Sequence, residues 1–255
     1  MKRIFTLLLI AAATTSQAQK SSDELVKHLT FQNLKNEVKA DFGSVDNPIQ
    51  SGAFQNIADR GAMQLRMRKL TNSYRWPDGS ALDFSKRGSK QGKTGVVDVY
   101  TLSKPGSTDT IRLHVDPYHT SESYYVPKGL VALNAPILDK EISPMVKIAE
   151  ELYVAPDASA LNESSGQLLS AINKQFGTDI FIDTAVVAPI VKDKEADKPF
   201  GFYLIRSYLF SKFLAMAKNI KNPTAYATKK MKENFNRYIV LHPEVKIGNL
   251  KESLK

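Results

Sequence analysis

A β-hairpin pattern is the sequence feature that most limits what this chain can fold into. Residues 96–102 (VVDVYTL) are rich in β-branched residues, and residues 110–116 (TIRLHVD) alternate between apolar and polar side chains. Between them, residues 105–107 (PGS) have the composition of a turn. Alternation of this kind is typical of a strand with one buried side and one solvent-facing side. Any fold of the chain is therefore expected to contain this antiparallel hairpin.

Helical periodicity dominates on both sides of the hairpin, with apolar residues recurring at spacings of three to four. The expected helices cover residues 22–40, 54–70, 143–153, 164–176, 200–220 and 224–239. A short strand is expected at 179–182, an edge strand or loop at 124–133, and a charged loop at 189–198. The fold class that follows is α+β. An N-terminal helix and a small antiparallel sheet precede a mainly helical C-terminal part.

The length of 255 residues suits one large domain or two small ones. The strand-like patterns end near residue 136, so we expect an α+β region over residues 19–136 and a mainly helical region over residues 137–255. Residues 1–18 are expected to be a separate signal peptide. No internal repeat and no long linker is visible in the sequence.

The N-terminal segment has the three parts of a secretory signal. Lys2 and Arg3 give a positive start, residues 5–13 (FTLLLIAAA) are apolar but too short to span a bilayer, and residues 16–18 (SQA) place small residues at a cleavage site. Cleavage after residue 18 would leave Gln19 as the new N-terminus. The alternatives are a short N-terminal anchor or a buried first helix. The expected location is exported, either periplasmic or secreted.

Charge and cysteine content restrict the partners and the chemistry. The chain has no cysteine, which excludes disulfides, thiolate metal sites and cysteine nucleophiles. Its formal charge is +9, and removal of Lys2 and Arg3 with the signal would lower it to +7. An exported basic protein is expected to meet anionic envelope polymers or another envelope protein rather than nucleic acid.

Two basic regions are candidates for anion binding: residues 200–232, with seven basic and no acidic residues, and residues 60–93. Residues 88–94 (GSKQGKT) approach the pattern of a phosphate loop, but only three residues separate the first glycine from Gly-Lys-Thr where that motif needs four. We therefore interpret residues 86–93 as a basic surface loop. The candidate anion-binding residues are Arg66, Arg68, Lys86, Arg87, Lys90 and Lys93.

One dense group of ligand-type side chains could form a metal site. His114 and Asp116 would project to the same side of a strand, and a returning loop could add His119 or Glu122. The alternative is that the first two belong to the polar face of the hairpin and the others to a loop. If the four side chains converge, they predict a divalent-metal centre of a periplasmic hydrolase.

Other signs of catalysis are missing from the sequence. The chain contains no His-Glu-x-x-His, Gly-x-Ser-x-Gly or Gly-x-Gly-x-x-Gly motif, and no cofactor is expected. Residues 199–220 are strongly apolar, but Arg206 and Lys212 interrupt them and disfavour a transmembrane span. We interpret this segment as a central buried helix. The alternative is an exposed surface that docks on a membrane or a partner.

Several short motifs between residues 47 and 133 resemble those of a β-rich module found in exported and lipid-anchored bacterial proteins. The shared motifs are Asn47-Pro48-Ile49, Asp78-Gly79, Arg87-Gly88-Ser89, residues 95–100 (GVVDVY), Asp116-Pro117-Tyr118 and Pro127-Lys128-Gly129. The chain lacks the cysteines that often follow Gly-Ser in that module. The resemblance covers about a third of the chain and implies a small β-rich envelope protein of unknown activity.

Some proteins with this module carry the label 2-dehydro-3-deoxyphosphooctonate aldolase. That enzyme resembles a (β/α)₈ barrel, which needs eight strand–helix alternations that one hairpin flanked by helices does not supply. We therefore do not transfer the aldolase activity. The sequence favours a non-catalytic binding or structural protein of the cell envelope, with the metal-dependent hydrolase as the competing hypothesis.

Overall fold

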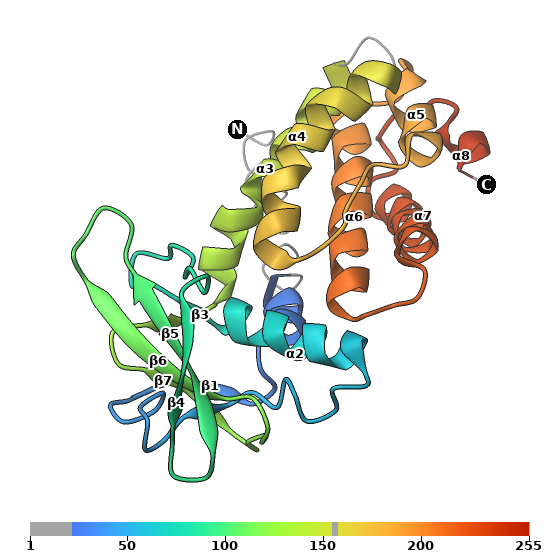
Figure 1. The fold of residues 1–255 in the computed structure, drawn as a ribbon. Coiled ribbons are helices and arrows are strands. Elements are labelled where there is room, and N and C mark those ends of the chain that lie inside the picture. Colours follow the sequence, from blue (N-terminus) through green and yellow to red (C-terminus); the bar gives the residue numbers. More distant parts are fainter. Residues whose placement is uncertain (1–21, 155–157, 255) are drawn as a thin grey trace. The chain divides into compact units, whose positions relative to one another are not determined.

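A computed structural model describes residues 22–154 and 158–254 and shows an α+β protein (Figure 1). The chain divides into two compact units, Met1–Leu138 and Asp139–Lys255. In the described ranges, no helix is both long and apolar enough to cross a membrane. The expected signal peptide lies outside these ranges.

The first unit contains a four-stranded sheet with the strand order β2-β6-β5-β4. β5 (Val96–Ser103) and β6 (Thr110–Asp116) pair antiparallel, which confirms the predicted hairpin. β4 (Arg87–Gln91) adds antiparallel to β5, whereas β2 (Ile49–Gln50) adds parallel to β6. The expected antiparallel sheet is therefore mixed, because its β2 edge comes from a distant segment rather than from a hairpin.

Two smaller pairings complete the strands of this unit. β1 (Leu34–Lys39) runs parallel to β7 (Tyr124–Pro127), and β3 (Tyr74–Arg75) runs antiparallel to β8 (Val131–Ala132). The predicted edge strand at 124–133 is thus present as the two short strands β7 and β8. Both pairings join segments more than 50 residues apart in the sequence, so no local turn could have indicated them.

Two further predictions for this unit were wrong. The helix expected over residues 22–40 covers only residues 22–29, and β1 follows it after Asn33, whose φ is 60°. The basic loop expected at 86–93 contains β4, whose five residues are all exposed. In both places a neighbouring strand supplies hydrogen bonds that local periodicity does not reveal.

Helix α2 (Arg60–Ser73) corresponds to the helix predicted at 54–70. Asp59 precedes it, and its side chain accepts a hydrogen bond from the Ala62 amide at 2.9 Å. This is an N-cap, which satisfies a backbone amide that the first turn leaves without a helical partner. The cap explains why the helix starts later than the apolar pattern suggested.

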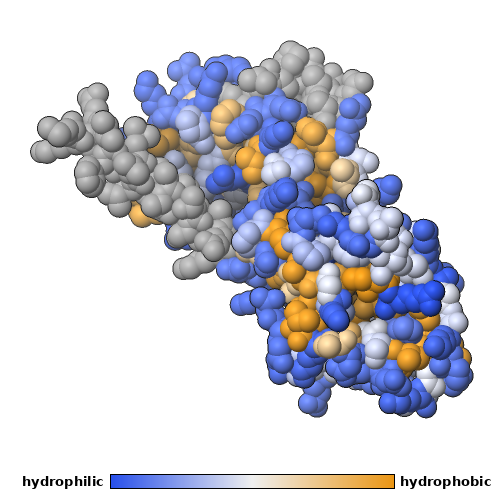
Figure 2. Space-filling view, turned by 90° about the vertical axis from the view of Figure 1, so that its left-hand side faces the viewer, coloured by the Kyte–Doolittle hydropathy of each residue, from blue (hydrophilic) through white to orange (hydrophobic). Residues whose placement is uncertain are grey.

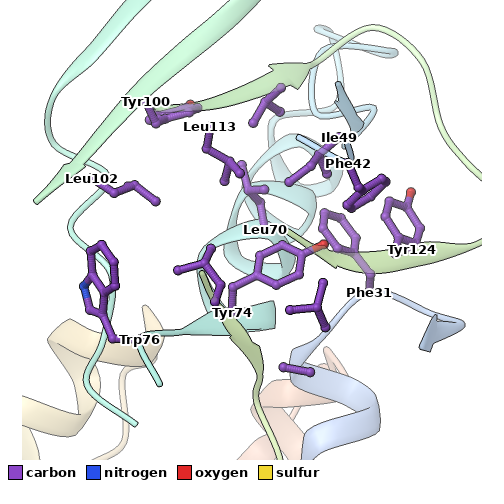
Figure 3. Close-up of a cluster of buried hydrophobic side chains, with 14 residues drawn as sticks. Phe31, Phe42, Ile49, Leu70, Tyr74, Trp76, Tyr100, Leu102, Leu113 and Tyr124 are labelled. Atoms are coloured by element: carbon purple, nitrogen blue, oxygen red, sulfur yellow. The ribbon is translucent and has the colours of Figure 1, made fainter. Parts of the chain in front are cut away.

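A core of aromatic and aliphatic side chains holds the first unit together. In Figure 3, Tyr100 and Leu102 of β5 and Leu113 of β6 lie around Leu70 of α2. Other members of this cluster are Phe31, Phe42, Ile49, Tyr74, Trp76, Val115, Tyr124, Val126, Leu130 and Ala132. Burial of apolar area at roughly 25 cal/mol per Å² makes such a cluster the main stabilising contribution.

The second unit is helical. Its helices are α3 (Ala135–Val154), which begins four residues before the division, then α4 (Ala158–Phe176), α5 (Thr184–Lys192), α6 (Lys198–Ala217), α7 (Pro223–Leu241) and α8 (Leu250–Ser253). The four C-terminal helices expected from periodicity are all present. α5 and α8 were not predicted, and residues 179–182 form no strand.

Helix α6 is the buried centre of the second unit. Its fully buried residues include Leu204, Leu209 and Phe213, and the Phe213 ring contacts the Phe176 ring at 5.2 Å between centroids. This confirms the interpretation of the apolar segment as a core helix. The docking alternative required exposed apolar side chains in this segment, and it is therefore wrong.

Exposed hydrophobic side chains are scattered over the described surface. In Figure 2, hydrophilic residues lie between the hydrophobic ones on the face that is shown. The large hydrophobic side chains that solvent reaches are Val38, Ile57, Val96, Tyr118, Phe181, Val240 and Leu241. Single exposed apolar residues are normal on soluble surfaces and do not by themselves mark a binding site.

Candidate functional site

The first unit contains a depression of about 730 Å³ that is lined mostly by polar side chains, and we call it the polar depression. One wall comes from α2, with Leu65, Arg66 and Lys69. The rest of the lining comes from residues 120–124, from residues 31–33 and from Ser51. The volume falls in the range of ordinary small-ligand sites.

The α2 wall presents two cations on one side of the helix, because residues three apart are neighbours on its surface. The Arg66 Nη1 donates to the Gly52 carbonyl at 3.1 Å and to Gln55 Oε1 at 2.9 Å. The Lys69 Nζ donates to the Thr30 carbonyl at 3.2 Å, and burial lowers the pKa of this lysine. Across the described residues, no ion pair joins either cation to a carboxylate.

The segment 120–124 brings hydroxyl groups and one carboxylate to the depression. The Ser121 Oγ donates to the Ser123 carbonyl at 2.8 Å, and the Ser121 amide donates to the Tyr124 hydroxyl at 3.3 Å. The Tyr124 hydroxyl in turn donates to the Gln50 carbonyl of β2 at 2.9 Å. This chain of bonds fixes the segment against the sheet, so its side chains hold defined positions at the depression.

Gly52 joins the two walls. It follows Ser51, which forms a β-bridge with Thr120, and its φ is +60°, a conformation that favours glycine. A Cβ atom at this position would overlap both the Arg66 Nη1 and the Thr120 Cγ2. The missing side chain therefore lets the guanidinium approach the backbone that it binds.

The combination of side chains suits binding of an anionic group. Arginine and lysine donate charge-assisted hydrogen bonds to carboxylate or phosphate oxygens, and these are stronger than bonds between neutral groups. The hydroxyls of Thr120, Ser121 and Ser123 can donate or accept further bonds. Both cations are half-buried, so the screening of their charge by solvent is weaker than at a fully exposed site.

The structure brings two of the four candidate metal ligands into contact. The His119 Nδ1 lies 2.7 Å from Asp116 Oδ2, while Asp116 Oδ1 accepts from the amides of Tyr118 and His119. The His114 Nδ1 lies 3.2 Å from the Gly43 carbonyl, and Glu122 lines the polar depression. No group of three or more His, Asp or Glu side chains in the described part of the chain could hold a metal ion.

The six candidate anion-binding residues are separated by the fold. Arg66 is the one that lines the polar depression, and Arg68 lies on the same helix. Arg87 forms an ion pair with Asp98 at 2.8 Å, and this hydrogen bond raises the pKa of the arginine. Lys93 pairs with Asp46 at 3.2 Å. The remaining two, Lys86 and Lys90, are exposed at β4.

Sequence reasoning missed Lys69 and the hydroxyl groups of the depression as site residues. The spacing of Arg66 and Lys69 on a predicted helix was a usable signal, because it places both cations on one side. The serines and the threonine at 120–123 carried no such signal. They reach α2 only through pairing of strands that are distant in sequence.

Comparison with known proteins adds no functional information. No family model, no curated protein and no solved structure matches this chain. The resemblance of residues 47–133 to the exported module therefore stays a prediction, and the function has to be inferred from the chain's own residues.

Proposed function

We propose that this chain is an exported cell-envelope protein that binds an anionic group in the polar depression without catalysing a reaction on it. The observation that carries the proposal is the pair Arg66 and Lys69, which line one depression and have no carboxylate partner among the described residues. The export part is supported by the sequence of residues 1–18.

The energetics of the two cations favour an anionic ligand. Burial lowers the pKa of Lys69 because its charged form loses hydration, and an anion placed beside the amine would restore much of that stabilisation. The Arg66 guanidinium is held by the Gly52 carbonyl and Gln55, so little side-chain freedom is lost on binding. Anionic groups on envelope polymers have the matching chemistry.

A binding role also agrees with the position of the groups that could act as a base. The Asp116 carboxylate orients His119, but the His119 side chain is 58% exposed and does not line the polar depression. General-base catalysis needs the base within hydrogen-bond reach of the reacting group. The metal-dependent hydrolase lacks support, since its four proposed ligands are not gathered into one group.

Calorimetric titration with inorganic phosphate and acetate tests the binding proposal. We expect Arg66→Met and Lys69→Met each to weaken anion binding about tenfold, the lower end of what a charged hydrogen bond contributes. We also expect affinity to fall as salt is raised, because the charges are screened. Lys90→Met is the matched control, since it removes a lysine from β4, outside the depression.

Two outcomes would contradict the proposal. One is that the wild-type chain binds neither anion, and the other is that Lys90→Met weakens binding as much as Lys69→Met. Cell fractionation tests the export part separately. A chain that begins at Gln19 is expected in the exported fraction, and a cytoplasmic chain with Met1 retained would refute it.

A further inference from the structure

The polar depression contains an acidic group as well as two basic ones. Glu122 lines it from the segment 120–124, and its side chain is exposed to solvent. Arg66 and Lys69 line it from α2. No ion pair joins Glu122 to either cation in the residues that the structure describes. Opposite charges therefore share one depression without neutralising each other.

Separate hydrogen bonds hold the two cationic side chains and the backbone of Glu122. Arg66 is tied to the Gly52 carbonyl, and Lys69 is tied to the Thr30 carbonyl. The backbone of Glu122 is tied down by Asn33, whose Nδ2 donates to the Glu122 carbonyl at 3.1 Å. The two donors are thus positioned before any ligand arrives, which reduces the entropy lost on binding, and the Glu122 carboxylate extends from a fixed backbone.

A ligand with a single negative charge would satisfy only part of this site. It would gain hydrogen bonds from Arg66 and Lys69, but it would share the depression with the negative charge of Glu122. A ligand that also carries an ammonium group would satisfy both walls, because a carboxylate accepts strong hydrogen bonds from a charged amine. The two walls are therefore complementary to a molecule with one group of each sign.

We propose that the polar depression binds a short peptide with both ends free, its carboxylate at Arg66 and Lys69 and its ammonium at Glu122. This assignment rests on the proposed anion-binding function and names the ligand class for that site. A depression of about 730 Å³ is large enough for a dipeptide, since small-ligand sites span roughly 300–1,000 Å³. The hydroxyls of Thr120 and Ser123 can bind the peptide group between the two ends.

Calorimetric titration with three probes tests the assignment on the full-length mature chain. The probes are alanylalanine, N-acetyl-alanylalanine, which lacks the ammonium, and alanylalanine amide, which lacks the carboxylate. We expect the free dipeptide to bind about tenfold more tightly than either blocked form, as one charged hydrogen bond would give. Glu122→Gln should weaken binding of the free dipeptide and remove its preference over the acetylated probe, without weakening the binding of the acetylated probe itself.

Glu37→Gln is the matched control, because it removes an exposed carboxylate from β1, outside the depression. The assignment is overturned if N-acetyl-alanylalanine binds to the wild-type chain as well as the free dipeptide does. It is equally overturned if the Glu122→Gln variant still binds the free dipeptide more tightly than the acetylated probe. It is also overturned if the amide binds as well as the free dipeptide. Binding of acetate without a preference for the ammonium would refute the ligand class alone, whereas absence of all anion binding would refute the proposed function.

Discussion

At the scale of single residues, Lys212 stands out in the second unit as a lysine whose charged side chain is buried. It is 1% exposed, and its Nζ donates to the Phe181 carbonyl at 2.8 Å and lies 3.4 Å from the centre of the Phe181 ring. Burial lowers the pKa of Lys212 to about 8, although Asp183 and Asp179 act in the opposite direction. The amine is thus held by the Phe181 carbonyl and ring and by the Tyr208 hydroxyl, and it forms no ion pair with a carboxylate in the part of the chain that the structure describes.

The pKa of Lys212 predicts how stability changes with pH. The unfolded chain keeps an ordinary lysine pKa of 10.5, so between pH 8 and that value it binds more protons than the folded chain. The free energy of unfolding should therefore gain a contribution that rises with pH in this window. Lys212→Met should remove that contribution, and urea unfolding at pH 8, 9 and 10 measures it.

The measurements stop at pH 10 because of Tyr208, whose pKa burial raises to about 12. Above pH 10 this tyrosine makes the free energy of unfolding fall as pH rises, which opposes the contribution of Lys212. Lys90→Met serves as the control, and its free energy of unfolding should change with pH as that of the wild type does. If Lys212→Met also keeps it, then Lys212 does not titrate as inferred.

Sequence patterns could identify residues of the site only where the pattern lay within a single helix or strand. Arg66 was identified because it belongs to a basic run on a helix, and the same run contains Lys69. Glu122 was assigned to a metal site, because its neighbours in sequence are histidines and an aspartate. Its place in the same depression as residues of α2 depends on strand pairings that join residues far apart, and no local pattern encodes those pairings.

At the scale of elements, one carboxylate links the end of α5 to the start of α8. Asp193 Oδ1 accepts from the amides of Glu195 and Ala196, and Asp193 Oδ2 accepts from the Asn249 amide at 2.6 Å. Gly248 lies so close that a Cβ atom there would meet this carboxylate. Hydrogen bonds to the buried Asp193 carboxylate therefore connect the start of the short helix α8 to the end of α5.

Asp193→Asn should destabilise the protein by about 1–3 kcal/mol, the cost of a buried hydrogen bond left unmade. The amide side chain keeps one acceptor oxygen but presents an NH₂ group where the second oxygen was. Thermal and urea unfolding measure the loss. Asp109→Asn, at an exposed turn, is the control and should change stability by less than about 0.5 kcal/mol. Equal stability of the Asp193 variant and wild type would contradict the link.

Sequence patterns predicted elements well where the pattern was local. The β5–β6 hairpin was identified because alternation and a turn lie within 21 residues, and α6 was identified from its continuous apolar run. β1 was mistaken for helix because four of its six residues are exposed, so no buried stripe marks it as a strand. The helix α5 was missed because Pro189 and the charges after it suggested a loop.

At the scale of the whole molecule, the two compact units offer separate probes of unfolding. The single tryptophan, Trp76, is 3% exposed in the core of the first unit, so its fluorescence reports on that unit. Far-ultraviolet circular dichroism is dominated by helices, and α3 to α8 lie in or extend into the second unit. The α+β class was predictable because strand-like patterns end where long helical patterns begin.

Phe213→Ala should lower the dichroism midpoint in urea by more than the Trp76 fluorescence midpoint. The substitution removes a fully buried ring of α6, which costs about 3–5 kcal/mol in comparable cores. Leu113→Ala in β6 is the reciprocal variant and should shift the fluorescence midpoint more. If each variant shifts both midpoints equally, the chain unfolds as one cooperative body.

The parallel pairing of β1 with β7 has a consequence for the newly made chain. The bond from Lys35 to Tyr125 joins residues separated by 90 positions, so β1 emerges from the ribosome long before its partner. At a synthesis rate of about 5–20 residues per second, the interval is about 5–20 s. During that time the β1–β7 pairing of the first unit cannot form. The unpaired β1 segment is then accessible to any chaperone that recognises nascent polypeptide.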